Sequence, residues 1–296
     1  MKIAALLCVK DEVELIGHTI DHLRAIGVGL IIAIDVNSTD GTESILESRR
    51  SENLRIIRVN DLDPNIGELH RVVSAAIASA SSAGADWMLV QDADEYWLPA
   101  TGSLSECAEL EDADLLSVDR FNVPPVCGEA GIQPPIMPEN YNRLSLVVKS
   151  APDFREVMRN NPRASWILGV PVPKIMVRPA LIASLRQAGH DAVPHDGVRL
   201  RRAKPTDLLI AHLPFTTQGR FARKIANIRR NIQVHDKNFR GDTAWHWRRW
   251  ITLSDQEGTN AEFERSYFDP ETIESLRRQG VVRSAAEVFR ERSRTG

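Results

Sequence analysis

Two carboxylates separated by one residue, Asp92 and Asp94, directly follow an apolar run from Trp87 to Gln91. The run predicts a buried strand, so both carboxylates should stand at its carboxyl end, where open α/β sheets bind their ligands. Acidic groups this close repel each other, which raises one pKa unless a cation lies nearby. Oxygen ligands of this kind suit Mg²⁺ or Mn²⁺, which also bind substrate phosphates. The pair indicates a divalent-metal site, and the alternative is a polar turn in which Asp94 caps a helix.

A second polar segment, Asp35-Val36-Asn37-Ser38-Thr39-Asp40-Gly41-Thr42, follows the apolar run 30–35. It is not a Gly-rich dinucleotide fingerprint, and Gly27-Val28-Gly29 precedes a strand rather than a helix. The chain also has no phosphate loop of the Gly-x4-Gly-Lys-Ser/Thr type. A nucleotide at this sheet edge must therefore be held by other groups.

The elements that must position these residues alternate in type along the first half of the chain. Apolar runs at 3–9, 30–35, 54–59, 87–91 and 114–119 predict strands, and helical patterns separate several of them. This alternation predicts an α/β fold with a mostly parallel sheet flanked by helices. Short strands are expected at 144–149, 175–178 and 207–212, a helix at 220–234, and two short helices after residue 269. We expect one catalytic domain over 1–235 and a C-terminal helical extension over 236–296.

Composition limits the classes of function. The 296 residues are 43% hydrophobic and 26% charged, as in ordinary globular proteins, and the net charge of −3 argues against a nucleic-acid binder. Residues 199–296 carry 20 basic and 12 acidic side chains, whereas residues 1–198 carry 17 and 28. The basic C-terminal third is interpreted either as solvated helix faces or as a surface for an anion, such as a phosphate-bearing substrate or an acidic membrane.

Cys8, Cys107 and Cys127 are scattered, so they predict neither a disulfide framework nor a zinc site. No apolar run approaches the length of a membrane span, and the run 3–9 is too short for a signal peptide. We therefore expect a cytoplasmic protein, with peripheral contact at the inner face of the membrane as an open alternative.

Several motifs follow one another along the chain in a defined order. The set comprises Cys8-Val9-Lys10-Asp11-Glu12, then His22-Leu23, Gly27-Val28, the acidic segment 35–42, and Asp92-Ala93-Asp94-Glu95-Tyr96. This set resembles the start of glycosyltransferase family 2, which has the GT-A fold, from residue 3 to about residue 98. Looser matches at Lys174-Ile175-Met176-Val177-Arg178-Pro179 and Ala211-His212-Leu213-Pro214-Phe215 extend the resemblance to about residue 230.

The resemblance implies a GT-A-like, Rossmann-type mixed sheet and a transferase that uses a nucleotide sugar, with a UDP-sugar favoured. Asp92 and Asp94 would hold Mn²⁺ or Mg²⁺ against the donor diphosphate. The acceptor would be a hydroxyl of a glycan or glycoconjugate. Val36 departs from the family pattern, in which many members carry an acidic residue or Asn at this position. Because the Val36 side chain cannot hydrogen-bond a base, Asp35 or Asp61 must contact the nucleoside. The residues expected to hold the nucleotide are Val9, Lys10, Glu12, Asp35, Asp40, Asp61, Asp92 and Lys224.

The resemblance also implies a third metal ligand from a C-terminal histidine. His212 ends an apolar strand and fits best, and His195 is second. His22 is expected to be a packed structural histidine. Lys224 and Arg220 lie four residues apart on one helix face, which suits either solvent or a diphosphate clamp.

The general base is expected to be a carboxylate within reach of the acceptor hydroxyl if the enzyme inverts configuration. Asp153 is favoured over Glu129, Glu139 and Glu156. Trp245, Trp247 and Trp250 leave three interpretations open: a sugar platform, a membrane anchor, or packing. Two further alternatives for the whole chain are a nucleotidyltransferase of sugar phosphates and an inactive nucleotide-sugar-binding scaffold.

Overall fold

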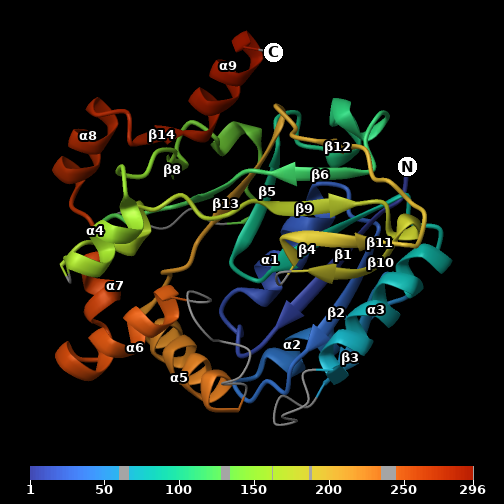
Figure 1. Cartoon of the computed structure of the whole chain (residues 1–296), viewed down its shortest axis with the longest axis horizontal. Coiled ribbons are helices and arrows are strands. Elements are labelled where there is room, and N and C mark those ends of the chain that lie inside the picture. Colours follow the sequence, from blue (N-terminus) through green and yellow to red (C-terminus); the bar gives the residue numbers. More distant parts are fainter. Residues whose placement is uncertain (60–66, 128–133, 162, 187–188, 235–244, 296) are drawn as a thin grey trace.

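The centre of the molecule is a seven-stranded sheet with the order β12-β6-β9-β4-β1-β2-β3 (Figure 1). The computed structural model describes residues 1–59, 67–127, 134–161, 163–186, 189–234 and 245–295. The strands of this sheet are β1 (Ile3–Val9), β2 (Leu30–Asp35), β3 (Leu54–Arg58), β4 (Trp87–Asp92), β6 (Leu115–Val118), β9 (Lys174–Val177) and β12 (Arg202–Ala203). β9 runs antiparallel to both of its neighbours, and the other strand pairs are parallel. The predicted mixed, mostly parallel sheet is confirmed.

The strand order reverses at β1. From β1 the chain proceeds outward through β2 and β3, and it returns to place β4 on the other side of β1. The residue pairs Val9–Asp35 and Cys8–Asp92 align the carboxyl ends of β1, β2 and β4 at one edge. Ligands of open α/β sheets bind at such a switch point. Both predicted polar segments therefore lie at the same edge.

Helices cover both faces of the sheet because the buried strands alternate their side chains between two cores. Ile3, Ala5 and Leu7 face one core, with α1 (Ile16–Ala25) and α2 (Thr42–Ser48). Ala4 and Leu6 face the other core. That second face is covered by α3 (Gly67–Ser82) and by the hairpin of β10 (Ile182–Arg186) and β11 (Asp191–Pro194), which lie beside each other in Figure 1.

A second, three-stranded sheet has the order β5-β13-β7, formed by β5 (Glu95–Pro99), β13 (Leu208–His212) and β7 (Arg120–Asn122). β13 is antiparallel to β5 and parallel to β7, and its register sets His212 opposite Glu95 on one side and Asn122 on the other. The sequence did not predict β5. Asp94 therefore lies in a two-residue turn between β4 and β5, and the expected alternative, a helix capped by Asp94, is wrong.

Below this sheet an aromatic cluster joins four helices, α4 (Phe154–Asn160), α5 (Gln218–Val234), α6 (Trp245–Glu257) and α7 (Ala261–Arg265). Trp250 is 2% exposed and contacts Trp166, Phe215 and Phe221 edge-on or tilted. Trp245 and Trp247 pack against the same cluster. Packing therefore accounts for these tryptophans. The remaining short 3₁₀ helices are Leu104–Glu106, Ala108–Leu110, Pro138–Asn140, Trp166–Leu168 and Pro179–Leu181.

The C-terminal segment contains α8 (Pro270–Arg278), β14 (Val282–Ser284) and α9 (Ala285–Thr295). β14 pairs antiparallel with β8 (Ser145–Val147), and Phe289 of α9 stacks on Tyr141 with ring centroids 5.5 Å apart. The two predicted helices are present, with an unpredicted strand between them. The domain boundary at 235/236 stays a prediction. Within the described ranges, no helix is long and apolar enough to cross a membrane.

Candidate active site

The loops that follow β1 and β2 are tied together by side-chain hydrogen bonds. Asp11, whose φ of 53° is left-handed, accepts hydrogen bonds from the Thr39 backbone at 2.6 Å and from the Asn227 amide at 2.9 Å. Lys10 Nζ donates to the carbonyl oxygens of Val36 and Asn37. Lys10, which is expected to contact the nucleotide, therefore also stabilises the loops at the edge of the site, together with Asp11.

Asp40 also links these two loops. Its carboxylate accepts hydrogen bonds from the Val13 backbone and from the backbone and hydroxyl of Thr42, at distances from 2.6 to 3.0 Å. Val9 is buried, and its carbonyl accepts the Val36 N–H at 2.9 Å. Nucleotide contacts by Asp40 and Val9 stay predictions.

A small hollow lies at the carboxyl ends of β2 and β3. It has a volume of about 190 Å³ and is lined by Asp35, Asn37, Ser38, Glu43, Arg58 and Val59. Asp35 is 2% exposed, and its Oδ1 accepts the Ser38 backbone N–H at 3.1 Å. Val36 does not line the hollow, in keeping with its unsuitability for base contact. Asp61 lies outside the described residues.

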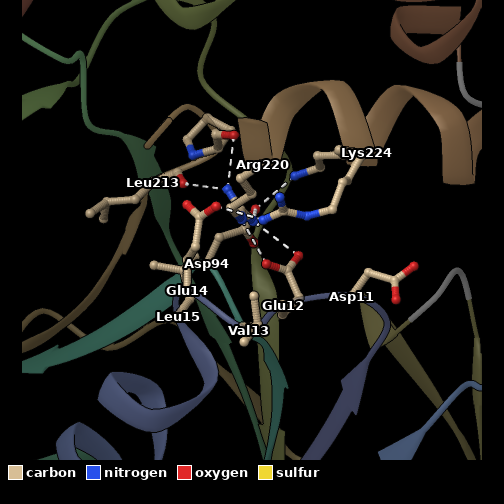
Figure 2. A network of polar contacts seen from close by, with 12 residues as sticks. Asp11, Glu12, Val13, Glu14, Leu15, Asp94, Leu213, Arg220 and Lys224 are labelled. Atoms are coloured by element: carbon tan, nitrogen blue, oxygen red, sulfur yellow. Dashed lines mark hydrogen bonds and ion pairs between the residues drawn. The ribbon is translucent and has the colours of Figure 1, made fainter. Parts of the chain in front are cut away.

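Asp94 is the centre of a buried charge network. Its Oδ2 accepts hydrogen bonds from Arg220 Nη2 at 2.8 Å and Lys224 Nζ at 2.7 Å. Arg220 also binds the Glu12 carboxylate, at 2.6 and 3.0 Å. Figure 2 shows Arg220 and Lys224 reaching down from α5 toward Asp94 and Glu12, while Asp11 lies apart. Burial alone would raise the pKa of Asp94, but the cationic side chains of Lys224 and Arg220 hold that pKa well below its usual range.

His212 presents a lone pair to the other oxygen of Asp94. The Asn122 amide nitrogen donates to the carbonyls of Ile167 and Gly169 at 3.1 and 2.8 Å, so its oxygen must accept from His212 Nδ1 at 2.7 Å. Nδ1 therefore carries the proton, and Nε2, 3.6 Å from Asp94 Oδ1, carries a lone pair. Burial lowers the pKa of His212 well below its usual value, which keeps the ring neutral.

Two acceptor atoms facing each other in a buried site are the arrangement that a cation would bridge. Asp94 Oδ1 and His212 Nε2 lie 3.6 Å apart, and each presents a lone pair that could face a common ion. A neutral imidazole and a carboxylate are also suitable donors for Mn²⁺. The residues present therefore fit a divalent ion.

Asp92 belongs to a neighbouring network. Its Oδ2 accepts a 2.7 Å hydrogen bond from Lys174 Nζ, and the Lys174 side chain is 1% exposed. Glu95 is fully buried and binds Arg120 at 2.5 Å, and it lies 3.7 Å from Lys174. Burial, together with Asp92, raises the pKa of Glu95 to about 7, against the opposing effect of Lys174 and Arg120. About half of the Asp92 side chain remains exposed.

Lys174, Glu95, Arg120 and Asn122 belong to the site although the sequence did not predict them as site residues. His190 is half-buried, and its Nδ1 lies 2.6 Å from the Pro173 carbonyl. Burial lowers the pKa of His190 to about 4, and the nearby charge of Lys174 adds to the effect. A lysine directly before the apolar residues Ile175–Val177 was the sequence feature that could have identified Lys174.

Other predicted residues lie elsewhere. Asp153 is exposed, with a φ of 51°, and occupies the N-cap position of α4 without a side-chain capping bond. Glu139, Glu156 and His195 are exposed, and Glu129 lies outside the described residues. The contacts of the described residues do not connect Asp153 or His195 with Asp94.

His22 is the packed histidine that the sequence predicted. Its Nδ1 accepts the Ile136 N–H at 3.2 Å, and its Nε2 contacts the Trp97 carbonyl at 2.8 Å. A separate group of potential ligands, Cys107, Glu109 and Asp207, lies near Leu208, at the opposite end of β13 from His212. In that group the Cys107 Sγ lies 3.0 Å from Asp207 Oδ1 and 3.3 Å from Glu109 Oε2, so its one S–H can donate to either carboxylate.

Comparisons with known proteins give distant structural similarities. No protein-family model matches the chain, and no curated protein matches it. Among solved structures, TarS of S. aureus (residues 1–349) is 16% identical, with 93% of this chain and 83% of that chain covered and a TM-score of 0.40. Glucosyl-3-phosphoglycerate synthase of Mycobacterium tuberculosis, in complex with Mn²⁺ and UDP, is 17% identical over 62% of this chain and 59% of its own, with a TM-score of 0.31.

A third similar structure is 4-diphosphocytidyl-2C-methyl-D-erythritol synthase, at 15% identity, with 45% and 67% of the two chains covered and a TM-score of 0.28. At these low identities and TM-scores, the assignment of a function depends on the site itself.

Proposed function

We propose that the protein is a metal-dependent glycosyltransferase that moves a sugar from a nucleotide donor to an acceptor hydroxyl. The observation that carries the proposal is the pair His212 Nε2 and Asp94 Oδ1, two acceptor atoms 3.6 Å apart at the switch point of the sheet. The cationic side chains of Arg220 and Lys224 on α5, and of Lys174 on β9, belong to this site and its neighbouring network, and they suit the binding of a diphosphate. The ordered motifs that resemble glycosyltransferase family 2 lie on the loops that form this site.

Asp94 and His212 would hold Mn²⁺ or Mg²⁺, with Asp92 as a further carboxylate beside them. When bound, the ion supplies Lewis-acid stabilisation of the charge that develops on the leaving diphosphate. Lys224 and Arg220 add positive charge at the same place, and the burial of Arg220 strengthens its effect because little water screens it. Asn122 keeps the His212 ring in the tautomer that leaves Nε2 unprotonated.

The nucleoside is proposed to lie over the hollow lined by Asp35 and Asn37, with a UDP-sugar as the donor. Asp35 is the nearest carboxylate for the base or ribose, and Lys10 and Glu12 border the path toward the diphosphate. The acceptor is proposed to be a hydroxyl of a growing glycan or glycoconjugate.

The proposed transfer inverts configuration and needs a base that takes the acceptor proton. Asp153 stays our candidate for this base. Its exposed position, at the N-cap of α4, leaves the carboxylate accessible to an acceptor. Asp153→Asn, with Glu156→Gln as a control from the same helix, tests the assignment. A loss of turnover for Glu156→Gln, but not for Asp153→Asn, would reverse it.

A thermal-shift panel tests the proposed function. Nucleoside diphosphates and their sugars are added with and without Mn²⁺, and a true donor raises the apparent stability by mass action. We expect the largest shift for a uridine compound with Mn²⁺, and a much smaller shift after chelation. Stabilisation that is the same with and without a chelator would contradict the metal site. Release of pyrophosphate from a nucleoside triphosphate would favour a nucleotidyltransferase instead.

A cytoplasmic location stays a prediction, and so does contact at the inner face of the membrane, which the basic C-terminal third suggests. Sedimentation with vesicles of acidic phospholipid tests the contact. Recovery in the supernatant at low salt would argue against it, since surface electrostatic attraction is strongest there.

A further inference from the structure

The carboxylates of the site are already paired with cations inside the protein. Asp94 is 4% exposed and Arg220 is 2% exposed. Asp94 and Glu12 carry two negative charges, and Arg220 and Lys224 carry two positive charges in direct contact with them. This half of the site is therefore electrically balanced without any ligand.

The neighbouring half is balanced in the same way when Glu95 is ionised, and it carries a net positive charge when Glu95 is protonated. Asp92 and Glu95 face Lys174 and Arg120, and three of these four side chains are almost fully buried. His212 is neutral. A divalent cation that enters alone therefore brings uncompensated positive charge into a site of low dielectric, which is costly. A diphosphate that enters alone brings uncompensated negative charge into the same site.

The two cations on Asp94 differ in their freedom to move. Arg220 is anchored by Glu12 and by the carbonyls of Leu213 and Pro214 as well as by Asp94. Lys224 is 24% exposed, and within the described structure its hydrogen bond is to Asp94 Oδ2. It lies one helical turn beyond Arg220 on α5 and reaches Asp94 through a flexible four-carbon stem.

We propose that Lys224 holds Asp94 in the empty enzyme and turns to the diphosphate when the donor binds, so that metal and nucleotide enter as one unit. This inference rests on the proposed function and adds to it the order in which the ligands bind. A metal ion on Asp94 Oδ1 is repelled by the charge of Lys224 on Oδ2 of the same carboxylate, whereas a diphosphate draws Lys224 away and supplies the missing negative charge.

The test measures the dissociation constant of Mn²⁺, by calorimetry and by the electron paramagnetic resonance of the unbound ion, for the wild type, Lys224→Met and Arg223→Met. Each titration is done alone, with inorganic pyrophosphate and with UDP. Arg223 is a matched control because it carries the same charge on the same helix but pairs with Glu14, at 2.5 Å, and lies 3.9 Å from Asp40 instead of contacting Asp94.

The wild type should bind Mn²⁺ at least about tenfold more weakly alone than with UDP, a difference of roughly 1.4 kcal/mol. Pyrophosphate should provide part of this coupling, because the charge rather than the base draws Lys224 away. Lys224→Met should bind Mn²⁺ alone about tenfold more tightly than the wild type and lose most of the coupling. Arg223→Met should retain the wild-type pattern. Lys224→Gln, which keeps a polar end, gives a second variant if the methionine variant does not fold.

An unchanged Mn²⁺ constant for the Lys224 variants without nucleotide, with coupling intact, would overturn the role of Lys224 and leave the proposed function standing. Equal Mn²⁺ affinity of the wild type with and without UDP would also overturn it. Failure of all three proteins to bind Mn²⁺ under any condition would overturn the metal-dependent function itself.

Discussion

At the scale of single residues, the feature that decides the chemistry is a relay of hydrogen bonds behind His212. Two backbone carbonyls orient the Asn122 amide, the amide fixes the ring tautomer, and the ring presents a lone pair to Asp94. Supporting groups of this kind set the basicity and direction of metal ligands. These hydrogen bonds support His212 as a metal ligand more strongly than the sequence does, because the sequence does not show which ring nitrogen carries the proton.

Replacing His212 with Ala should raise the dissociation constant of Mn²⁺, measured with UDP present, by about 10- to 100-fold. The metal-free protein should lose stability too, since His212 is 7% exposed and contacts the edge of Trp166. The constant is therefore reported per folded molecule. His195→Ala, an exposed histidine that the sequence ranked second, should leave the constant unchanged. The opposite ranking of the two variants would transfer the ligand role to His195.

His22 should make the protein sensitive to acid. Burial lowers its pKa to about 4 in the folded state, against an ordinary value of 6.5. Between these values the unfolded chain binds more protons, so stability is present above pH 6.5 and falls as the pH drops toward 4. The contribution is on the order of 3 kcal/mol. Urea denaturation across this range should show a shallower loss for His22→Gln, although His190 and His246 retain their own contributions. Parallel curves for the two proteins would refute the assignment.

The site residues that could be predicted from the sequence lie at the carboxyl ends of strands. Asp35, Asp92 and Asp94 could be predicted because each follows an apolar run, and the structure brings their strand ends to one edge. Glu95 could not, because a buried carboxylate inside a strand has no sequence signature until its partner Arg120 is known. That partner comes from a different strand of the second sheet.

At the scale of elements, the parallel strands and their helices were predictable from their periodicity, and the second sheet was not. β5 follows β4 after the turn Ala93-Asp94, which contains neither glycine nor proline. Asp94 is therefore its one turn-favouring residue, and that signal does not distinguish a turn into a strand from a turn into a helix. β9 was expected as a short strand, but its place between β4 and β6 depends on pairing with strands far away in sequence.

Helix α9 should be an integral part of the fold. Phe289 is 8% exposed and stacks on Tyr141, whose hydroxyl donates to the Pro99 carbonyl of β5 at 2.7 Å. Phe289→Ala should lower the free energy of unfolding by about 3–5 kcal/mol, as for other buried phenylalanines. Arg290→Ala, at the next and exposed position, should change it by no more than about 0.5 kcal/mol. Equal denaturation midpoints for the wild type and Phe289→Ala would show that α9 is dispensable.

At the scale of the whole molecule, charge is divided along the chain. Residues 1–198 carry 17 basic and 28 acidic side chains, and residues 199–296 carry 20 and 12. Part of the basic excess lies on α5, where Arg220 and Lys224 enter the site. The rest of the segment contributes to the long-range field that an anionic donor meets.

The association rate of UDP should therefore fall as salt is added. The Debye length shrinks from about 10 Å at 0.1 M salt to about 3 Å at 1 M, which screens distant charges before it affects buried pairs. Stopped-flow measurements with Mn²⁺ present should show a several-fold loss of association rate over this range, with a smaller change in dissociation. A rate that does not depend on salt would show that the basic C-terminal third does not steer the donor.

The position of β9 in the sheet also constrains how the chain is made. β6 pairs with β9 and β12, and both of these strands come later in the sequence. While the ribosome is still adding residues before Lys174, β1 to β4 can already pair, but Leu115–Val118 has neither of its neighbours and exposes an apolar segment. Assembly of the sheet therefore proceeds in two stages during synthesis. A translational pause within the intervening segment would lengthen the interval in which nascent chains need a chaperone or aggregate.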